Sequence, residues 1–206
     1  MPFTRVVAIG LAGDELELRL RDGEAERRAA QRRLDDLSCQ LALLAVDDEL
    51  TGLRNEGYIA QRVEESVRLA RRYEVPVAWV LIGVDDLAGV GERFGESFAD
   101  HVLVQAAHRP KRSVRSTDLL SRYGRQEFLL LAPLTTLQGA AVLAQRLLAA
   151  VAGEPVERQA HSVRPTVSAG VTAFRGGMAS AGELIQGAVE ALGRARARGA
   201  QQIEAQ

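Results

Sequence analysis

The order of apolar and polar residues divides the chain into a β-like start, one long helical stretch and then alternating helices and strands. Residues 3–9 and 15–20 are rich in β-formers or alternate apolar with polar, and residues 10–14 separate them as a turn. This pattern predicts a β-hairpin over residues 1–22. Because two strands alone are marginal in water, we expect the hairpin to pack on another surface.

The next stretch predicts a single helix over residues 23–46. Residues 24–46 contain no Pro or Gly, and their apolar side chains repeat at steps of four and three: Ala30, Leu34, Leu37, Leu41 and Leu44. Such a seam is typical of a parallel coiled coil, which would make the protein a homodimer through this helix. The same seam would also suit packing on the chain's own domain, and the pattern does not choose between the two.

From residue 47 onward, segments with the apolar period of a helix alternate with segments typical of strands, which predicts an α/β layer fold. We expect helices over Tyr58–Tyr73, Gly95–Arg115 (broken near Pro110), Leu137–Ala152 and Ala181–Arg198. Strands are predicted over Val75–Val84, Leu119–Tyr123, Phe128–Ala132 and His161–Ala173. Trp79 and Tyr73 are expected to be core residues.

Composition narrows the class of protein. The 206 residues are 47% hydrophobic and 26% charged, enough for one domain with a proper core and an appendage, and the net charge of -1 provides no field for nucleic acid. Cys39 has no partner for an internal disulfide, and neither a secretion signal nor an apolar run of about 20 residues is present. We therefore expect a cytoplasmic protein with no nucleic-acid partner and no membrane insertion.

Four segments carry motifs in a recognisable order. Residues 48–55 read Asp-Glu-Leu-Thr-Gly-Leu-Arg-Asn, Asp100 precedes Val102-Leu103, residues 122–128 read Arg-Tyr-Gly-Arg-Gln-Glu-Phe, and residues 167–171 read Val-Ser-Ala-Gly-Val. In this order and spacing they resemble the GGDEF family of diguanylate cyclases, across about residues 47–202. In the first motif, the resemblance implies that Asp48 and Thr51 hold a turn together while the leucines enter the core.

The resemblance implies a fold and a domain plan. Residues 47–206 would form a nucleotidyl-cyclase-like α+β domain, with a central, mostly antiparallel sheet flanked by helices. Residues 23–46 would be its signalling helix, and residues 1–22 resemble the last strands of a PAS sensor.

The resemblance also implies chemistry that this chain has partly lost. Family members join two GTP molecules into cyclic di-GMP on paired cations held by carboxylates. Here Gly83 and Gln126 stand where the two principal acids belong, Ala88 replaces a phosphate-facing Lys, and Gly91 replaces a guanine-binding Asn. We therefore expect a degenerate member that is not an enzyme, needs no cofactor and has lost its Mg²⁺ site.

Several active-site positions nevertheless keep polar or signature residues: Asp85, Asp100, Gly124, Arg125, Gln126, Glu127 and Arg196. Asp100 matches an acid that accepts hydrogen bonds from a guanine edge, although an acid there could equally be a helix-surface or capping residue. Arg196 keeps a positive charge where the family has Lys.

A second ligand site is implied ahead of the signature hairpin, the predicted strand pair Leu119–Tyr123 and Phe128–Ala132 that carries the motif of residues 122–128. Arg115 and Asp118 have the spacing of the family's inhibitory Arg-x-x-Asp site for cyclic di-GMP, and Arg146 aligns with the arginine that closes that site. The planar fork of Arg suits phosphate oxygens and a guanine edge, while Asp118 would accept from guanine N–H groups. A solvated i,i+3 ion pair is the plain alternative.

The sequence therefore predicts a catalytically inactive signalling protein that binds cyclic di-GMP through Arg115, Asp118 and Arg146 and acts on an effector protein not identified by the sequence. Two alternatives remain at this stage. One is a scaffold for dimerisation or protein interaction that binds no nucleotide, and the other is a residual cyclase that uses Asp85 and Glu127 as metal ligands.

Overall fold

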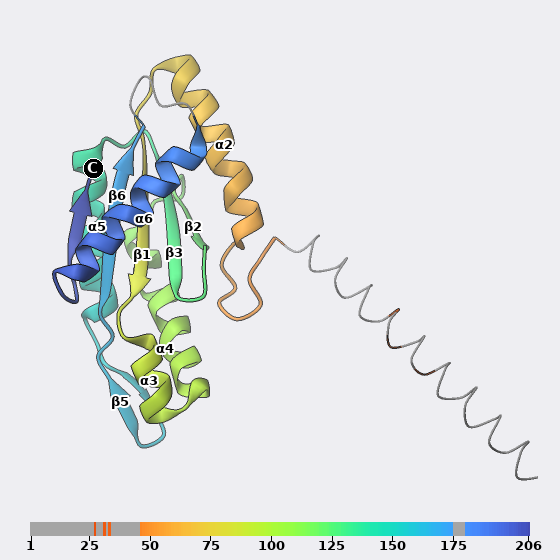
Figure 1. The fold of residues 1–206 in the computed structure, drawn as a ribbon, viewed down its shortest axis with the longest axis vertical. Coiled ribbons are helices and arrows are strands. Elements are labelled where there is room, and N and C mark those ends of the chain that lie inside the picture. The colour runs from red at the N-terminus through yellow and green to blue at the C-terminus, as the bar shows by residue number, and fades with distance from the viewer. Residues whose placement is uncertain (1–26, 28–30, 32, 34–45, 175–179) are drawn as a thin grey trace, which may run out of the picture. The chain divides into compact units, whose positions relative to one another are not determined.

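The structure, a computed structural model, describes residues 27, 31, 33, 46–174 and 180–206 (Figure 1). The chain divides into two units, Met1–Ala45 and Val46–Gln206. The hairpin expected over residues 1–22 lies outside the described residues, as does most of the helix expected over residues 23–46, of which Arg27, Gln31 and Arg33 are described and helical. Both elements, and the homodimer built on the helix, stay predictions.

The second unit is built on a five-stranded sheet in the order β2-β3-β1-β6-β7. Its strands are β1 (Val77–Val84), β2 (Leu119–Arg122), β3 (Glu127–Pro133), β6 (Val167–Ala173) and β7 (Ile203–Ala205). All neighbours pair antiparallel except β6 and β7. The mostly antiparallel central sheet expected from the resemblance is confirmed.

Helices cover both faces of this sheet. Every residue of β1 is therefore buried, although successive side chains point to opposite sides. Val77, Trp79 and Leu81 pack with α2 (Glu56–Tyr73) and α6 (Ala181–Ala197), which lie on the nearer face in Figure 1. The intervening residues of β1 pack with α4 (Glu96–His108) and α5 (Leu137–Ala152). Gly83 therefore belongs to the face that α6 covers.

Local sequence sets where these helices begin and end. The Asn55 side chain caps α2 by accepting from the Tyr58 N–H at 2.9 Å, and Thr136 caps α5 by accepting from the Gly139 N–H at 3.2 Å. As expected, α4 stops just before Pro110, and the chain continues as a short 3₁₀ helix, η1 (Arg109–Ser113). No helix among the described residues is long and apolar enough to cross a membrane.

Three short elements were not anticipated. Helix α3 (Leu87–Phe94) follows β1 directly, and the three-residue strands β4 (Val156–Arg158) and β7 lie after α5 and α6. In addition, the strand expected over residues 161–173 is two strands, β5 (His161–Val163) and β6, separated at Pro165. Proline cannot donate to a ladder, which accounts for this interruption.

Candidate functional site

The signature residues sit on the hairpin between β2 and β3, beside the end of β1. The N–H groups of Tyr123 and Gly124 donate to the Glu127 carbonyl at 2.9 and 3.2 Å, closing the turn. Gly83 lies opposite Glu127 across the β1–β3 pair, and the Val84 N–H donates to the Gln126 carbonyl at 3.0 Å. The fold therefore brings together the positions at which the sequence has lost its expected metal ligands.

Arg196 of α6 fills the space that a side chain at position 83 would need. A Cβ built on Gly83 would lie 2.7 Å from Arg196 Cζ and closer still to Nη2. The guanidinium donates from Nη1 to Glu127 Oε1 and from Nη2 to the Val84 carbonyl, both at 3.3 Å. A fixed cation is thus part of the site.

These residues do not fit the divalent cations of the family. Gly83 offers no side chain, Gln126 brings a neutral amide, and the Asp85 carboxylate accepts from the Gln201 N–H at 3.0 Å. Asp85, Gln126 and Arg196 do line one open cavity of about 460 Å³. Within the described part of the chain, however, no three His, Cys, Asp or Glu side chains are grouped to hold a metal ion.

A neighbouring cavity of about 420 Å³ collects most of the other active-site positions. Its polar lining comes from α3, α4 and the signature hairpin: Glu92, Glu96, Asp100, Arg122, Arg125, Gln126 and Glu127. Asp100 is an exposed residue within α4, and the N-cap of that helix is Gly95, so Asp100 is not a capping residue. The four carboxylates make the cavity rich in acceptors, which suits N–H donors better than phosphate.

An ion pair between the entrance motif, residues 48–55, and the signature hairpin was not predicted from the sequence. Arg122 Nη1 lies 3.1 Å from both carboxylate oxygens of Asp48, and its N–H donates to the Arg54 carbonyl at 2.9 Å. The side chains of Arg122 and Asp48 are only 18% and 21% exposed. Only the opposite charges of the two residues hinted at this pair, because they lie 74 positions apart in the sequence.

The entrance turn itself forms as expected, with one correction. Asp48 Oδ1 accepts from the Thr51 N–H and hydroxyl at 2.8 and 2.7 Å, and Leu53 is buried, but Leu50 is 37% exposed. Leu50 faces solvent because the turn places only one of the two leucines against the core. Burial raises the pKa of Asp48, but hydrogen bonds from Thr51 and Arg122 outweigh it and hold that pKa below its usual value.

The Arg-x-x-Asp segment and the aligned arginine meet at a third cavity. Arg115 and Arg146 both line a space of about 350 Å³ together with Leu134 and the start of α5. Among the described residues, neither guanidinium has a hydrogen-bond or ion-pair partner. Asp118 does not line this cavity: its Oδ2 accepts from the Arg115 N–H at 3.0 Å, and its enclosed Oδ1 has no partner in the described part of the protein.

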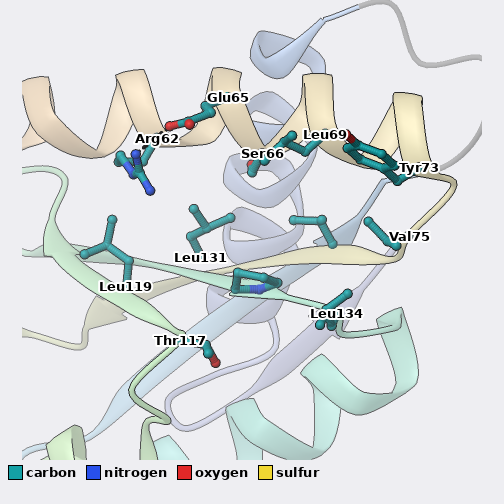
Figure 2. A pocket seen from close by; sticks show the side chains of 12 residues that line it. Arg62, Glu65, Ser66, Leu69, Tyr73, Val75, Thr117, Leu119, Leu131 and Leu134 are labelled. Carbon is teal, nitrogen blue, oxygen red and sulfur yellow. Dashed lines mark hydrogen bonds and ion pairs between the residues drawn. The ribbon is translucent and has the colours of Figure 1, made fainter.

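A fourth, mostly apolar cavity of about 380 Å³ lies between α2 and the strands β2 and β3 (Figure 2). Figure 2 shows Leu69 and Tyr73 of α2 on one side and Leu119 and Leu131 on the other. Tyr73 was expected in the core, but it ends α2 and is 60% exposed at the rim, whereas Trp79 is fully buried. Leu134 lines both this cavity and that of Arg115 and Arg146.

Comparison with known proteins agrees with this architecture. The diguanylate cyclase DgcP of Pseudomonas aeruginosa is 31% identical over 90% of this chain, and the response regulator PleD of Caulobacter vibrioides is 33% identical over 90%. The chain spans only 27% and 41% of their lengths. The crystal structure of diguanylate cyclase SiaD from P. aeruginosa, in complex with its activator SiaC, superposes with a TM-score of 0.73 at 27% identity, covering 96% of this chain and 75% of SiaD.

A family model described as the GGDEF domain of diguanylate cyclases matches residues 45–202. This range includes the entrance motif, the signature hairpin, α6 and all four cavities. The chain belongs to the GGDEF family.

Proposed function

We propose that this GGDEF protein is catalytically inactive and serves as a receptor for cyclic di-GMP. The observation that carries the proposal is the meeting of Arg115 and Arg146 at one cavity with both guanidinium groups unpaired among the described residues. Two convergent arginines without internal partners retain their full capacity for an anionic ligand. Their planar forks suit phosphate oxygens and guanine edges in a bidentate way.

Asp118 supports the same ligand in a different manner. Its Oδ2 fixes the turn that presents Arg115, while Oδ1 still lacks a donor. A carboxylate oxygen without a partner is costly, and a guanine N–H group would satisfy it if the turn adjusted on binding. Asp118 is therefore assigned both the positioning of Arg115 and the recognition of the base.

Catalytic inactivity is supported by the groups at the end of β1. Removal of one stabiliser of transition-state charge typically lowers a rate about 10²- to 10³-fold, and Gly83, Gln126 and Arg196 together replace the negative charge that two-metal chemistry needs. The cyclase activity in the names of DgcP and SiaD is therefore not carried over to this chain. Signal output through an effector protein, and homodimerisation through residues 23–46, are part of the same proposal.

Calorimetric titration of cyclic di-GMP tests the receptor. Because bonds to a charged group contribute about 1.5–3 kcal/mol, Arg115→Ala and Arg146→Ala should each weaken binding by about 10- to 100-fold. Arg112→Ala is the matched control, since Arg112 is an exposed arginine of η1 that lines none of the four cavities. Equal affinity in wild type and both cavity variants would remove this site.

Incubation with GTP and Mg²⁺ or Mn²⁺, followed by chromatography for cyclic di-GMP, tests the inactivity separately. We expect no product above a Glu127→Ala control. Product that disappears in this control would establish the residual cyclase instead.

A nucleotide-independent scaffold is the second candidate, and the cavity in Figure 2 favours it. Leu69, Tyr73 and Leu134 are 47%, 60% and 69% exposed around that cavity, an apolar cluster suited to a protein partner. The scaffold would be supported if no titration heat appeared with cyclic di-GMP and an effector bound wild type and Arg115→Ala equally.

A further inference from the structure

We infer that the guanidinium of Arg196 is a built-in replacement for the divalent cation, so that the signature hairpin is neutralised from within and the site excludes Mg²⁺ and Mn²⁺. The inference concerns a different place from the Arg115 cavity. Like the proposed inactivity, it depends on the lost metal ligands. The inactivity is tested by product formation from GTP, whereas the built-in cation is tested by metal binding and unfolding, so either can fail alone.

The position of the group carries the inference. Arg196 comes from the last turn of α6, on the sheet face where the side chain of residue 83 would project. A Cβ at position 83 would overlap the Arg196 guanidinium in its present position, so the guanidinium would have to shift. Glycine within a fully buried strand marks such a close approach, and here the approaching group is a cation.

The partners of Arg196 are oxygen atoms of the kind that a hard cation takes. Its two terminal nitrogens contact a carboxylate oxygen of Glu127 and the backbone carbonyl of Val84. The ion pair is largely sheltered, with side chains 32% and 24% exposed. Glu127 is thereby neutralised without any ion from solution.

The surrounding ligands would not favour a metal beside this group. A divalent cation would stand next to a fixed positive charge, with the Asp85 carboxylate engaged by the Gln201 N–H and only a neutral amide at Gln126. Repulsion by Arg196 and the missing negative charge at positions 83 and 126 both weaken the binding of a divalent cation. Restoring carboxylates alone should therefore fail, because the first new acid would pair with Arg196.

Mn²⁺ binding to the 206-residue chain, followed by electron paramagnetic resonance of the free ion, tests this directly. Wild type should show no saturable binding in the millimolar range. The double variant Gly83→Asp, Gln126→Glu should remain a poor binder, and adding Arg196→Ala should raise its Mn²⁺ affinity at least about tenfold, the effect of removing one neighbouring charge. Tight binding by wild type, or equal affinity in the double and triple variants, would overturn the inference.

Thermal unfolding supplies a second measurement that needs no repaired variant. Arg196→Gln leaves Glu127 without its cation and should lower the midpoint by about 2–4 °C, whereas Arg68→Gln should lower it less, because Arg68 is an exposed arginine of α2 without a side-chain partner among the described residues. Millimolar Mn²⁺ should not raise the wild-type midpoint. The built-in cation would be contradicted if Mn²⁺ raised the wild-type midpoint, or if the Arg196→Gln variant unfolded at the same temperature as wild type.

Discussion

The cavities at the end of β1 and the cavity beside α5 both contain arginine, but they differ in what the arginine already contacts. At the end of β1, Arg196 is paired with Glu127 and Arg122 with Asp48, and only Arg125, at the tip of the hairpin, lacks a side-chain partner among the described residues. Beside α5, Arg115 and Arg146 have no side-chain partner among the described residues. An arginine that is paired within the chain stabilises the folded state, whereas an unpaired arginine is available to bind a ligand. The difference separates a structural region from a recognition region within one domain.

The largest effect should come from emptying the recognition region. The double variant Arg115→Ala, Arg146→Ala removes both guanidinium groups from the cavity and should weaken cyclic di-GMP binding by about 10²-fold or more, because each group contributes about 1.5–3 kcal/mol. Calorimetry gives the affinity, and unfolding curves should barely change, since neither group has a partner to lose. A large loss of stability would break the comparison.

The structural region should respond in the opposite way. Asp48→Asn weakens the tie to Arg122 and the turn bonds from Thr51, so the free energy of unfolding at neutral pH should fall by about 1–3 kcal/mol while ligand affinity stays within about twofold. Urea unfolding and calorimetry on the same preparations measure the two quantities. Asp47→Asn is the control, because its ion pair with Arg54 is well exposed.

The same residue predicts a pH dependence. The folded pKa of Asp48 lies below its ordinary value of 3.8, so the folded state binds this proton less readily than the unfolded chain. Its stabilising contribution is complete above pH 3.8 and is lost as the pH falls through the folded pKa. The stability gap between wild type and Asp48→Asn should therefore close in that acid range, and a gap that widened there would contradict the assignment.

A smaller effect is expected for a conservative change in the recognition region. Arg115→Lys keeps the charge but loses the planar fork, so cyclic di-GMP affinity should fall about tenfold, less than for alanine. Raising the salt concentration should weaken wild type and the lysine variant in parallel. Full retention of affinity by lysine would indicate that the cavity senses charge alone.

The smallest effect should come from Leu134, which lines both the apolar cavity and the Arg115 cavity. Its φ of 52° is left-handed, so Leu134→Gly relieves about 1 kcal/mol of backbone cost but adds a similar entropy to the unfolded chain. The unfolding free energy should change by less than about 0.5 kcal/mol, as measured in urea. A larger loss would show that Leu134 contributes to the packing of both cavities.

The sequence predicts the long elements of the fold well, because their periods are long enough to recognise. Helices α2, α5 and α6 and strand β1 match the expected ranges to within a few residues, and Pro110 ends α4 as expected. The strands β4 and β7 have only three residues each, too few for a period to be recognised; β4 pairs with the adjacent β5, and β7 pairs with β6 far back in the sequence. Helix α3 was missed because it has only eight residues and two of them are glycines.

The site was predictable in its positions but not in its contacts. The motif order places Gly83 beside Gln126 and Glu127, and strand register confirms it. No pattern reveals that Arg196 turns into the space above Gly83, or that Asp48 joins Arg122. These contacts depend on how α6 and the entrance turn pack, although an isolated glycine in a buried strand was a usable signal for the first.

The position of Arg196 also orders the substitutions by which such a chain could change. The guanidinium occupies the empty space above Gly83, so any side chain at position 83 requires the end of Arg196 to move. An aspartate introduced at position 83 would meet that guanidinium first, so it would pair with Arg196 before it could hold a metal ion. If Arg196 is the built-in cation inferred above, carboxylates introduced one at a time should bring no gain in metal binding, and a change at Arg196 has to accompany them.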